Sequence, residues 1–155
     1  MHPLHAALLH SFQQASEDID KFTTGLTDEQ MWAEPFGLAS VGFQIRHIAG
    51  SVDRLLTYAR GEQLSETQLE ALKSEKEPGA GRADLIDFLR RQMEQAEEVV
   101  RSIDPNSAGE ERAVGRKRLP TTVGGLLIHV AEHTQRQVGQ CIITAKIVRE
   151  QAALR

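Results

Sequence analysis

The chain contains one cysteine, Cys141, and therefore cannot form an internal disulfide. A lone thiol fits a reducing compartment. Long apolar runs are also missing, since no stretch approaches the ~20 residues that a membrane-spanning helix needs. The segment Met1–His5 lacks the basic start and the apolar run of a secretory signal peptide. We therefore expect a cytoplasmic protein that does not associate with a membrane.

An excess of positive charge is absent as well. The 18 Lys and Arg residues are outnumbered by 22 Asp and Glu, giving a formal net charge of −4, so nucleic acid is not a favoured partner. One basic cluster comprises Arg112, Arg116, Lys117 and Arg118. Such a cluster is most often a solvated surface, and its functional alternative is a dock for an anionic group on a substrate. The length of 155 residues is typical of a single domain, here residues 1–155.

Four long segments carry apolar residues at the three- and four-residue spacing of amphipathic helices. They run from Leu4 to about Thr23, from Ser40 to Gly61, from Leu85 to Ile103, and from about Val123 to Ala153. Shorter helices are expected at 27–32 and 65–72, and a loop at 104–120. No segment shows the alternating pattern of a strand. These features predict an all-α fold, an antiparallel four-helix bundle with short extra helices in its loops.

The connection between the second and third long helices leaves one question open. Residues 62–81 are polar and end in an evident linker, Glu75–Gly81. This segment is long enough for a crossover connection instead of a simple hairpin. Sequence spacing does not decide between the two.

Three histidines on two of these helices form the candidate site. His129 and His133 are four residues apart and so share one helix face. Two imidazoles at this spacing can hold one divalent ion, with Zn–N distances of about 2.0–2.1 Å. His47, on the second long helix, could supply a third nitrogen from a facing helix. Three histidine ligands with one open coordination position are typical of a catalytic metal centre. Two histidines four residues apart on a helix, such as His129 and His133, also arise by chance.

Polar residues extend this pattern along the last helix. Leu126, His129, His133, Gln137 and Gln140 follow one another at spacings of three or four. If this stripe faces the bundle interior, unpartnered polar groups there cost about 1–3 kcal/mol each, and a metal ion or ligand would relieve that cost. Gln44, three residues before His47, could orient an imidazole or a bound water. Gln44, Gln137 and Gln140 are therefore candidates for assisting the metal or binding the substrate.

Two segments resemble a known family, the DinB-like (YfiT-like) superfamily. They are Ser40–Gly50, with the sequence SVGFQIRHIAG, and His129–Gln140, with the sequence HVAEHTQRQVGQ. The resemblance covers nearly the whole chain and implies a four-helix bundle in which a histidine triad grips a divalent metal, nickel or zinc. It also implies a homodimer and an enzyme that uses a low-molecular-weight thiol, such as bacillithiol or mycothiol, to convert a small-molecule substrate.

The chain departs from the family pattern at one ligand position. The family motif His-x-x-x-His-x-Gly-Gln, aligned on Gly139 and Gln140, places ligands at positions 133 and 137, and position 137 is glutamine here. A glutamine oxygen is a poorer ligand than imidazole for these metals. His47 and His133 are common to every arrangement, and either His129 or Gln137 completes the site.

Two functions follow from these alternatives. The first is a metal-dependent enzyme, a thiol-dependent S-transferase or a hydrolase, in which the ion lowers the pKa of a bound water or thiol. The second is a non-catalytic bundle with a degenerate metal site that acts in ligand binding or in a stress response. The substitution at Gln137 motivates the second.

Overall fold

The computed structural model describes residues 1–155 and is dominated by four long helices. The long helices are α1 (Pro3–Thr23), α3 (Val41–Ala59), α5 (Arg82–Ser102) and α6 (Val123–Ala153). The connections contain α2 (Asp28–Met31), the 3-10 helix η1 (Pro35–Gly37), α4 (Glu66–Ser74), the 3-10 helix η2 (Pro105–Gly109), and the strands β1 (Glu111–Val114) and β2 (Leu119–Thr122). The predicted four-helix bundle with short helices in its loops is confirmed.

Side-chain caps fix the helix boundaries close to the predicted positions. Ser40 accepts a hydrogen bond from the Phe43 amide at the start of α3, and Thr122 accepts one from Gly125 at the start of α6. Each bond satisfies a backbone N–H that has no partner within the first turn of its helix. Gly61 ends α3 with a φ of 78°, a conformation that glycine adopts without steric cost.

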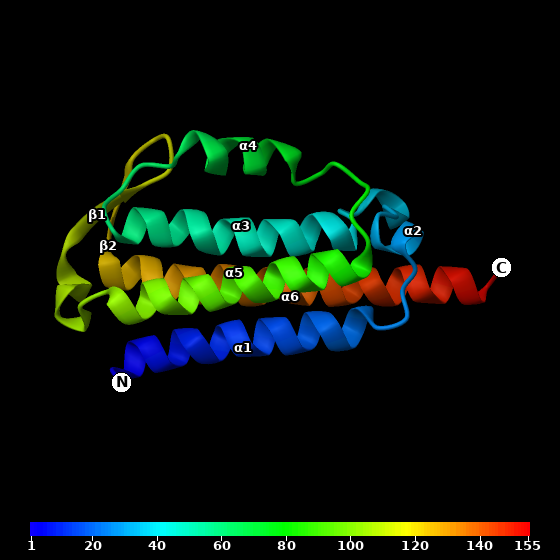
Figure 1. Ribbon diagram of the computed structural model, residues 1–155, viewed down its shortest axis with the longest axis horizontal. Coiled ribbons are helices and arrows are strands. Elements are labelled where there is room, and N and C mark those ends of the chain that lie inside the picture. Colours follow the sequence, from blue (N-terminus) through cyan, green and yellow to red (C-terminus); the bar gives the residue numbers. More distant parts are fainter.

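The crossover alternative is the one that the structure adopts. Helices α1 and α6 run in one direction and α3 and α5 in the other, with α4 returning the chain along the outside of the bundle (Figure 1). The packed pairs α1–α5 and α3–α6 are therefore antiparallel, whereas α1–α6 and α3–α5 are parallel. Because α4 lies over α3, residues of the long connection come close to the site-bearing face of the bundle.

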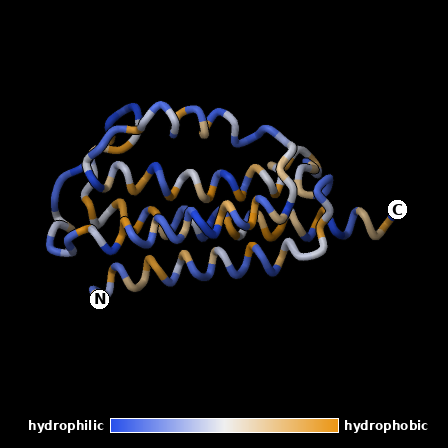
Figure 2. The backbone as a smooth tube through the Cα atoms, viewed as in Figure 1, coloured by the Kyte–Doolittle hydropathy of each residue, from blue (hydrophilic) through white to orange (hydrophobic).

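The core consists of apolar side chains that all four long helices contribute. Leu8, Ile45, Leu89 and Val130, one from each helix, are at most 1% exposed. Truncating such a leucine to alanine costs about 2–5 kcal/mol. Hydrophobic residues recur along the four bundle helices, whereas α4 is mostly hydrophilic (Figure 2). No helix of the structure has the length and apolar character needed to cross a membrane.

A small β-hairpin, from Glu111 to Thr122, lies mostly within the segment 104–120, which the sequence pattern assigns to a loop. Strands β1 and β2 pair antiparallel, from Glu111 opposite Thr122 to Val114 opposite Leu119. Arg112 fastens the hairpin to the bundle, since its Nε donates a hydrogen bond to the Ala59 carbonyl at 2.8 Å. The turn, residues 115–118, lies beside the second half of α3, where it lines a cavity together with Leu55 and Tyr58, and it carries the rest of the basic cluster.

Candidate functional site

His47 is held in one orientation by a carboxylate from the crossover segment. Its Nδ1 lies 2.9 Å from Oε2 of Glu75, the residue that follows α4. An ionised carboxylate only accepts hydrogen bonds, so Nδ1 carries a proton, and the other ring nitrogen, Nε2, lies 3.4 Å from the Ser51 hydroxyl. Phe43 stacks on the imidazole with a centroid separation of 5.3 Å. The ring is thus fixed from two sides, with one nitrogen available as a ligand.

Glu75 is buried, and two donors keep it ionised. Its Oε1 accepts a hydrogen bond of 2.7 Å from Nη1 of Arg54, and its side chain is only 5% exposed. Burial by itself raises the pKa of Glu75, but the hydrogen bonds from His47 and Arg54 outweigh burial and lower the pKa below its usual value. Arg54 also donates a hydrogen bond to the Ser51 hydroxyl at 3.2 Å.

The backbone around Glu75 is pinned as well. Arg46 donates hydrogen bonds from Nη1 to the carbonyls of Ser74 and Glu77, at 3.2 and 2.6 Å. Gly50 leaves room for the ion pair, because a Cβ at this position would lie 2.7 Å from Oε1 of Glu75. The crossover segment is therefore joined to α3 at three points, and the carboxylate cannot leave His47 without breaking several contacts.

His133 on α6 meets His47 across the α3–α6 interface. The centroids of the two rings are 5.4 Å apart. Nδ1 of His133 is buried and has no hydrogen-bond partner. Burial, followed by the nearby positive charge of His47 and His129, lowers the pKa of His133 to about 4. His133 is consequently a neutral imidazole at pH 7, with a free lone pair.

His129 lies near His133 but in a different environment. The two ring centroids are 5.9 Å apart, as expected for neighbours one turn apart on α6. His129 is exposed, whereas His133 and Gln137 are half-buried and Gln140 is exposed. The polar stripe on α6 therefore does not face the core along its whole length. It lies along the border between the α3–α6 contact and solvent.

The three glutamines make no hydrogen bond to the candidate histidines. Gln44 is 3% exposed and donates through Nε2 to the Thr144 hydroxyl at 3.2 Å, which joins α3 to α6 away from His47. Its Oε1 is buried without a partner. The predicted roles of Gln44, Gln137 and Gln140 in binding a substrate or orienting a ligand stay predictions.

Whether these residues fit a divalent ion can be judged from the ring separations. An ion at about 2.0–2.1 Å from a nitrogen of each of two imidazoles, at a tetrahedral angle, places their centroids roughly 5 Å apart. The 5.4 Å between His47 and His133 fits such an ion, as does the unpartnered Nδ1 of His133. However, no group of three His, Cys, Asp or Glu side chains is arranged as a complete set of metal ligands. Two imidazoles fit, and a third ligand is not assembled.

Sequence reasoning missed Glu75, Arg54 and Ser51. Glu75 falls in the segment interpreted as a linker, and nothing in its neighbourhood marks it as different from Glu77. Arg54 and Ser51 each continue the polar face that begins at His47, at spacings of four and then three residues. That spacing was the available signal for these two, whereas Glu75 could be found only with the path of α4 known.

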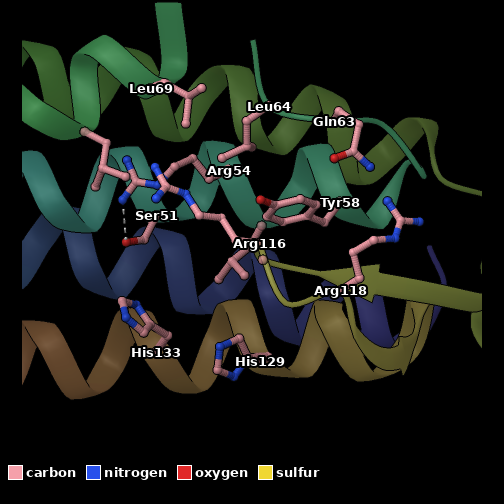
Figure 3. A pocket seen from close by; sticks show the side chains of 13 residues that line it. Ser51, Arg54, Tyr58, Gln63, Leu64, Leu69, Arg116, Arg118, His129 and His133 are labelled. Atoms are coloured by element: carbon pink, nitrogen blue, oxygen red, sulfur yellow. Dashed lines mark hydrogen bonds between the residues drawn. The ribbon is translucent and has the colours of Figure 1, made fainter. Parts of the chain in front are cut away.

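A cavity of about 550 Å³ opens beside the two histidines of α6. It lies between α3, α4, the hairpin turn and α6, and it is lined by Ser51, Arg54, Leu55, Tyr58, Gln63, Leu64, Leu69, Leu72, Gly115, Arg116, Arg118, His129 and His133. His129, His133 and Ser51 lie on one side of the cavity, below Arg54 in Figure 3. The volume is within the range of about 300–1,000 Å³ that is typical of small-molecule sites.

Comparison with known proteins gives a family match and several similar structures. The profile of the DinB superfamily matches residues 11–141. No curated protein sequence shows significant similarity to the chain. Several solved structures are similar to the chain. One is a DinB-like protein from Bacillus cereus, which is 18% identical. The match has a TM-score of 0.68 and covers 94% of this chain and 91% of that one.

Two further solved structures share the fold. A conserved protein from Enterococcus faecalis is 17% identical, with a TM-score of 0.74 over 97% of this chain and 99% of its own. YfiT from Bacillus subtilis is described as a "probable metal-dependent hydrolase with an unusual four-helix bundle topology". It is 12% identical, with a TM-score of 0.68 over 92% of this chain and 86% of its own. At these identities the similarity establishes the fold.

Proposed function

Because the chain, matched over residues 11–141, belongs to the DinB superfamily, we propose that it is a metal-dependent enzyme that acts on a small molecule. The reaction is a hydrolysis or the transfer of a group to or from a low-molecular-weight thiol, and the metal is nickel or zinc. The description of YfiT as a "probable metal-dependent hydrolase" supports the metal and the hydrolytic alternative. The observation that carries the proposal is the meeting of the His47 and His133 imidazoles, 5.4 Å apart between α3 and α6.

His47 and His133 are the proposed metal ligands. Glu75 accepts the Nδ1 proton of His47 and thereby presents Nε2 as the ligand atom, which is how carboxylates orient metal-binding histidines in many proteins. His133 is neutral at pH 7, since its pKa is lowered to about 4, so no proton has to leave before it binds. His129 or Gln137 completes the site.

The bound ion supplies Lewis acidity, which lowers the pKa of a water or thiol. The chain's own residues perform the remaining tasks. Leu55, Leu64 and Tyr58 line the cavity beside the histidines and exclude bulk water from one side. Arg54, fixed by its ion pair with Glu75, holds the Ser51 hydroxyl in place at the edge of the site. A small substrate in the cavity would lie between these groups and the two imidazoles.

Metal titration tests the proposal. Zinc and nickel are titrated calorimetrically into chelator-treated protein, and the wild type is compared with H47A, H133A and the control H10A, which removes an exposed histidine of α1. We expect H47A and H133A each to weaken binding by at least about tenfold, because each removes one ligand, and H10A to leave it unchanged. Equal affinity in all four proteins would contradict the proposal.

The second candidate function, a non-catalytic ligand-binding bundle, has two observations in its favour. The structure lacks a group of three ligands around one point, and position 137 holds glutamine. Thermal unfolding separates the two candidates, because a ligand at a hundred times its dissociation constant stabilises the folded protein by about 2.7 kcal/mol. No shift with zinc or nickel would favour the second candidate.

A further inference from the structure

The cavity beside His133 has an apolar wall and an unbalanced charge. Its apolar side chains come from two elements, Leu55 and Tyr58 from α3 and a set of leucines from the α4 side, Leu64, Leu69 and Leu72. Its charged side chains are Arg54, Arg116 and Arg118, and no Asp or Glu lines it. A cavity with these walls suits a ligand that has both an apolar body and a negative charge.

Two of the three arginines have no protein partner. Arg54 is neutralised by Glu75 through the 2.7 Å ion pair. Arg116 and Arg118, in contrast, make no salt bridge and no side-chain hydrogen bond. The chain as a whole carries a formal charge of −4. The two unpaired guanidinium groups therefore make the cavity positively charged, although the chain as a whole is negative. An oxyanion bound there would accept hydrogen bonds from both groups.

The hairpin gives these two arginines a defined position. Backbone pairing runs from Glu111–Thr122 to Val114–Leu119, directly up to the turn that carries them. Arg112 fastens the base of the hairpin to the Ala59 carbonyl. Arg118 has a φ of 47° within the tight turn. In Figure 3, Arg118 and Gln63 lie at one end of the cavity, His133 and Ser51 lie at the other, and Tyr58 is between them.

We propose that this cavity binds a small organic anion with an apolar body. The anionic group, a carboxylate or a phosphate, contacts Arg116 and Arg118, and the apolar body packs between Tyr58 and the leucines of the α4 side. The opposite end of the ligand then points toward His133. The role of this ligand as the substrate rests on the proposed metal-dependent function, whereas binding of the ligand to the cavity does not require the metal.

Calorimetric titration with matched probes tests the inference. The probes are octanoate, octyl phosphate and octanol, which share an alkyl chain and differ in their head group. The full-length wild type is compared with R116Q/R118Q, with R116K/R118K, which keeps the charges, and with the control R91Q/R155Q, which removes two arginines outside the cavity. Comparing octanoate with octyl phosphate shows which oxyanion the site prefers.

We expect at least one of the two anions to bind at least about tenfold more tightly than octanol. The R116Q/R118Q variant should lose that difference, while R116K/R118K and R91Q/R155Q should retain most of it. Raising the salt concentration from about 50 to about 500 mM should weaken the binding of the anion, because the guanidinium groups are solvent-exposed. No saturable binding of either anion, or equal binding of octanol, would overturn the proposal, as would an unchanged affinity in R116Q/R118Q.

The H47A variant separates this inference from the proposed enzyme function. His47 does not line the cavity, so its removal eliminates a proposed metal ligand while every side chain that lines the cavity remains. Anion binding that survives in H47A supports the cavity proposal even if no metal binds. Metal binding without anion binding would refute the cavity proposal and leave the enzyme proposal standing.

Discussion

His47 and Glu75 are 28 residues apart in the sequence and are joined by a hydrogen bond of 2.9 Å between Nδ1 and Oε2. The bond exists because α4 returns along α3 and delivers the carboxylate to the imidazole. It fixes the tautomer of one proposed ligand, and the same carboxylate neutralises Arg54. Several expected outcomes depend on this small network.

Replacing Glu75 by glutamine should destabilise the protein by about 3 kcal/mol at pH 7, because Arg54 is left buried without its counter-charge. Urea denaturation measures the change, and E70Q, an exposed residue of α4 without an ion pair, is the control. The pKa of Glu75 is lowered in the folded protein, so its contribution is fully present above its unfolded value of 4.5. That contribution is lost as the pH falls through the lower folded pKa. The difference between the wild type and E75Q should therefore shrink in acid, and a constant difference would contradict this assignment.

Acidification should also destabilise the protein through His133. The pKa of His133 falls from 6.5 to about 4 on folding, so between these values the unfolded chain binds more protons than the folded one. The stability that this neutral imidazole contributes is present above pH 6.5 and is lost as the pH falls toward 4. The metal-free H133L variant should lose less stability than the wild type between pH 7 and pH 5, as measured by urea unfolding. Parallel losses in both proteins would show that His133 does not titrate in this way.

The third ligand of the proposed metal site can be identified by a gain of affinity. Gln137 stands where the family motif has histidine, so Q137H should bind zinc at least about tenfold more tightly than the wild type. The companion variant H129A should leave the affinity unchanged if position 137 completes the site. A loss in H129A with no gain in Q137H would assign the third position to His129.

Cys141 should be unreactive in the folded protein. It is fully buried, and burial raises the pKa of its thiol to about 12, so almost no thiolate is present at pH 8. Labelling with a chromogenic disulfide reagent should be slow in buffer and fast in urea, at a rate that follows global unfolding. Rapid labelling in buffer would contradict the packing of α6. An unreactive Cys141 also means that it does not serve as the nucleophile of the proposed reaction.

The sequence was sufficient to predict the bundle and the proximity of His47 to His133, whereas the predicted set of three histidines around one ion stays a prediction. Periodic apolar residues define which face of α3 and α6 is buried, and His47 and His133 lie at the border of those faces. The connection of 62–81 could not be resolved, because a polar segment carries little information about the surface it crosses. Glu75 was missed for this reason.

The hairpin was missed for a different reason. Each strand has four residues, none of them is buried, and Pro120 occupies a position in β2. Such short exposed strands have no alternating apolar pattern, and a proline argues against a strand. The basic cluster was visible in the sequence, but the position of Arg116 and Arg118 in the cavity wall follows from the hairpin and from the bond between Arg112 and Ala59.

The central claim, that His47 and His133 bind one divalent ion, is tested most directly by anomalous diffraction from crystals grown with zinc or nickel. We expect an anomalous peak between the two imidazoles, at about 2.0–2.1 Å from one nitrogen of each ring. A peak bonded to neither ring, or no peak from a protein crystallised with excess metal, would contradict the account.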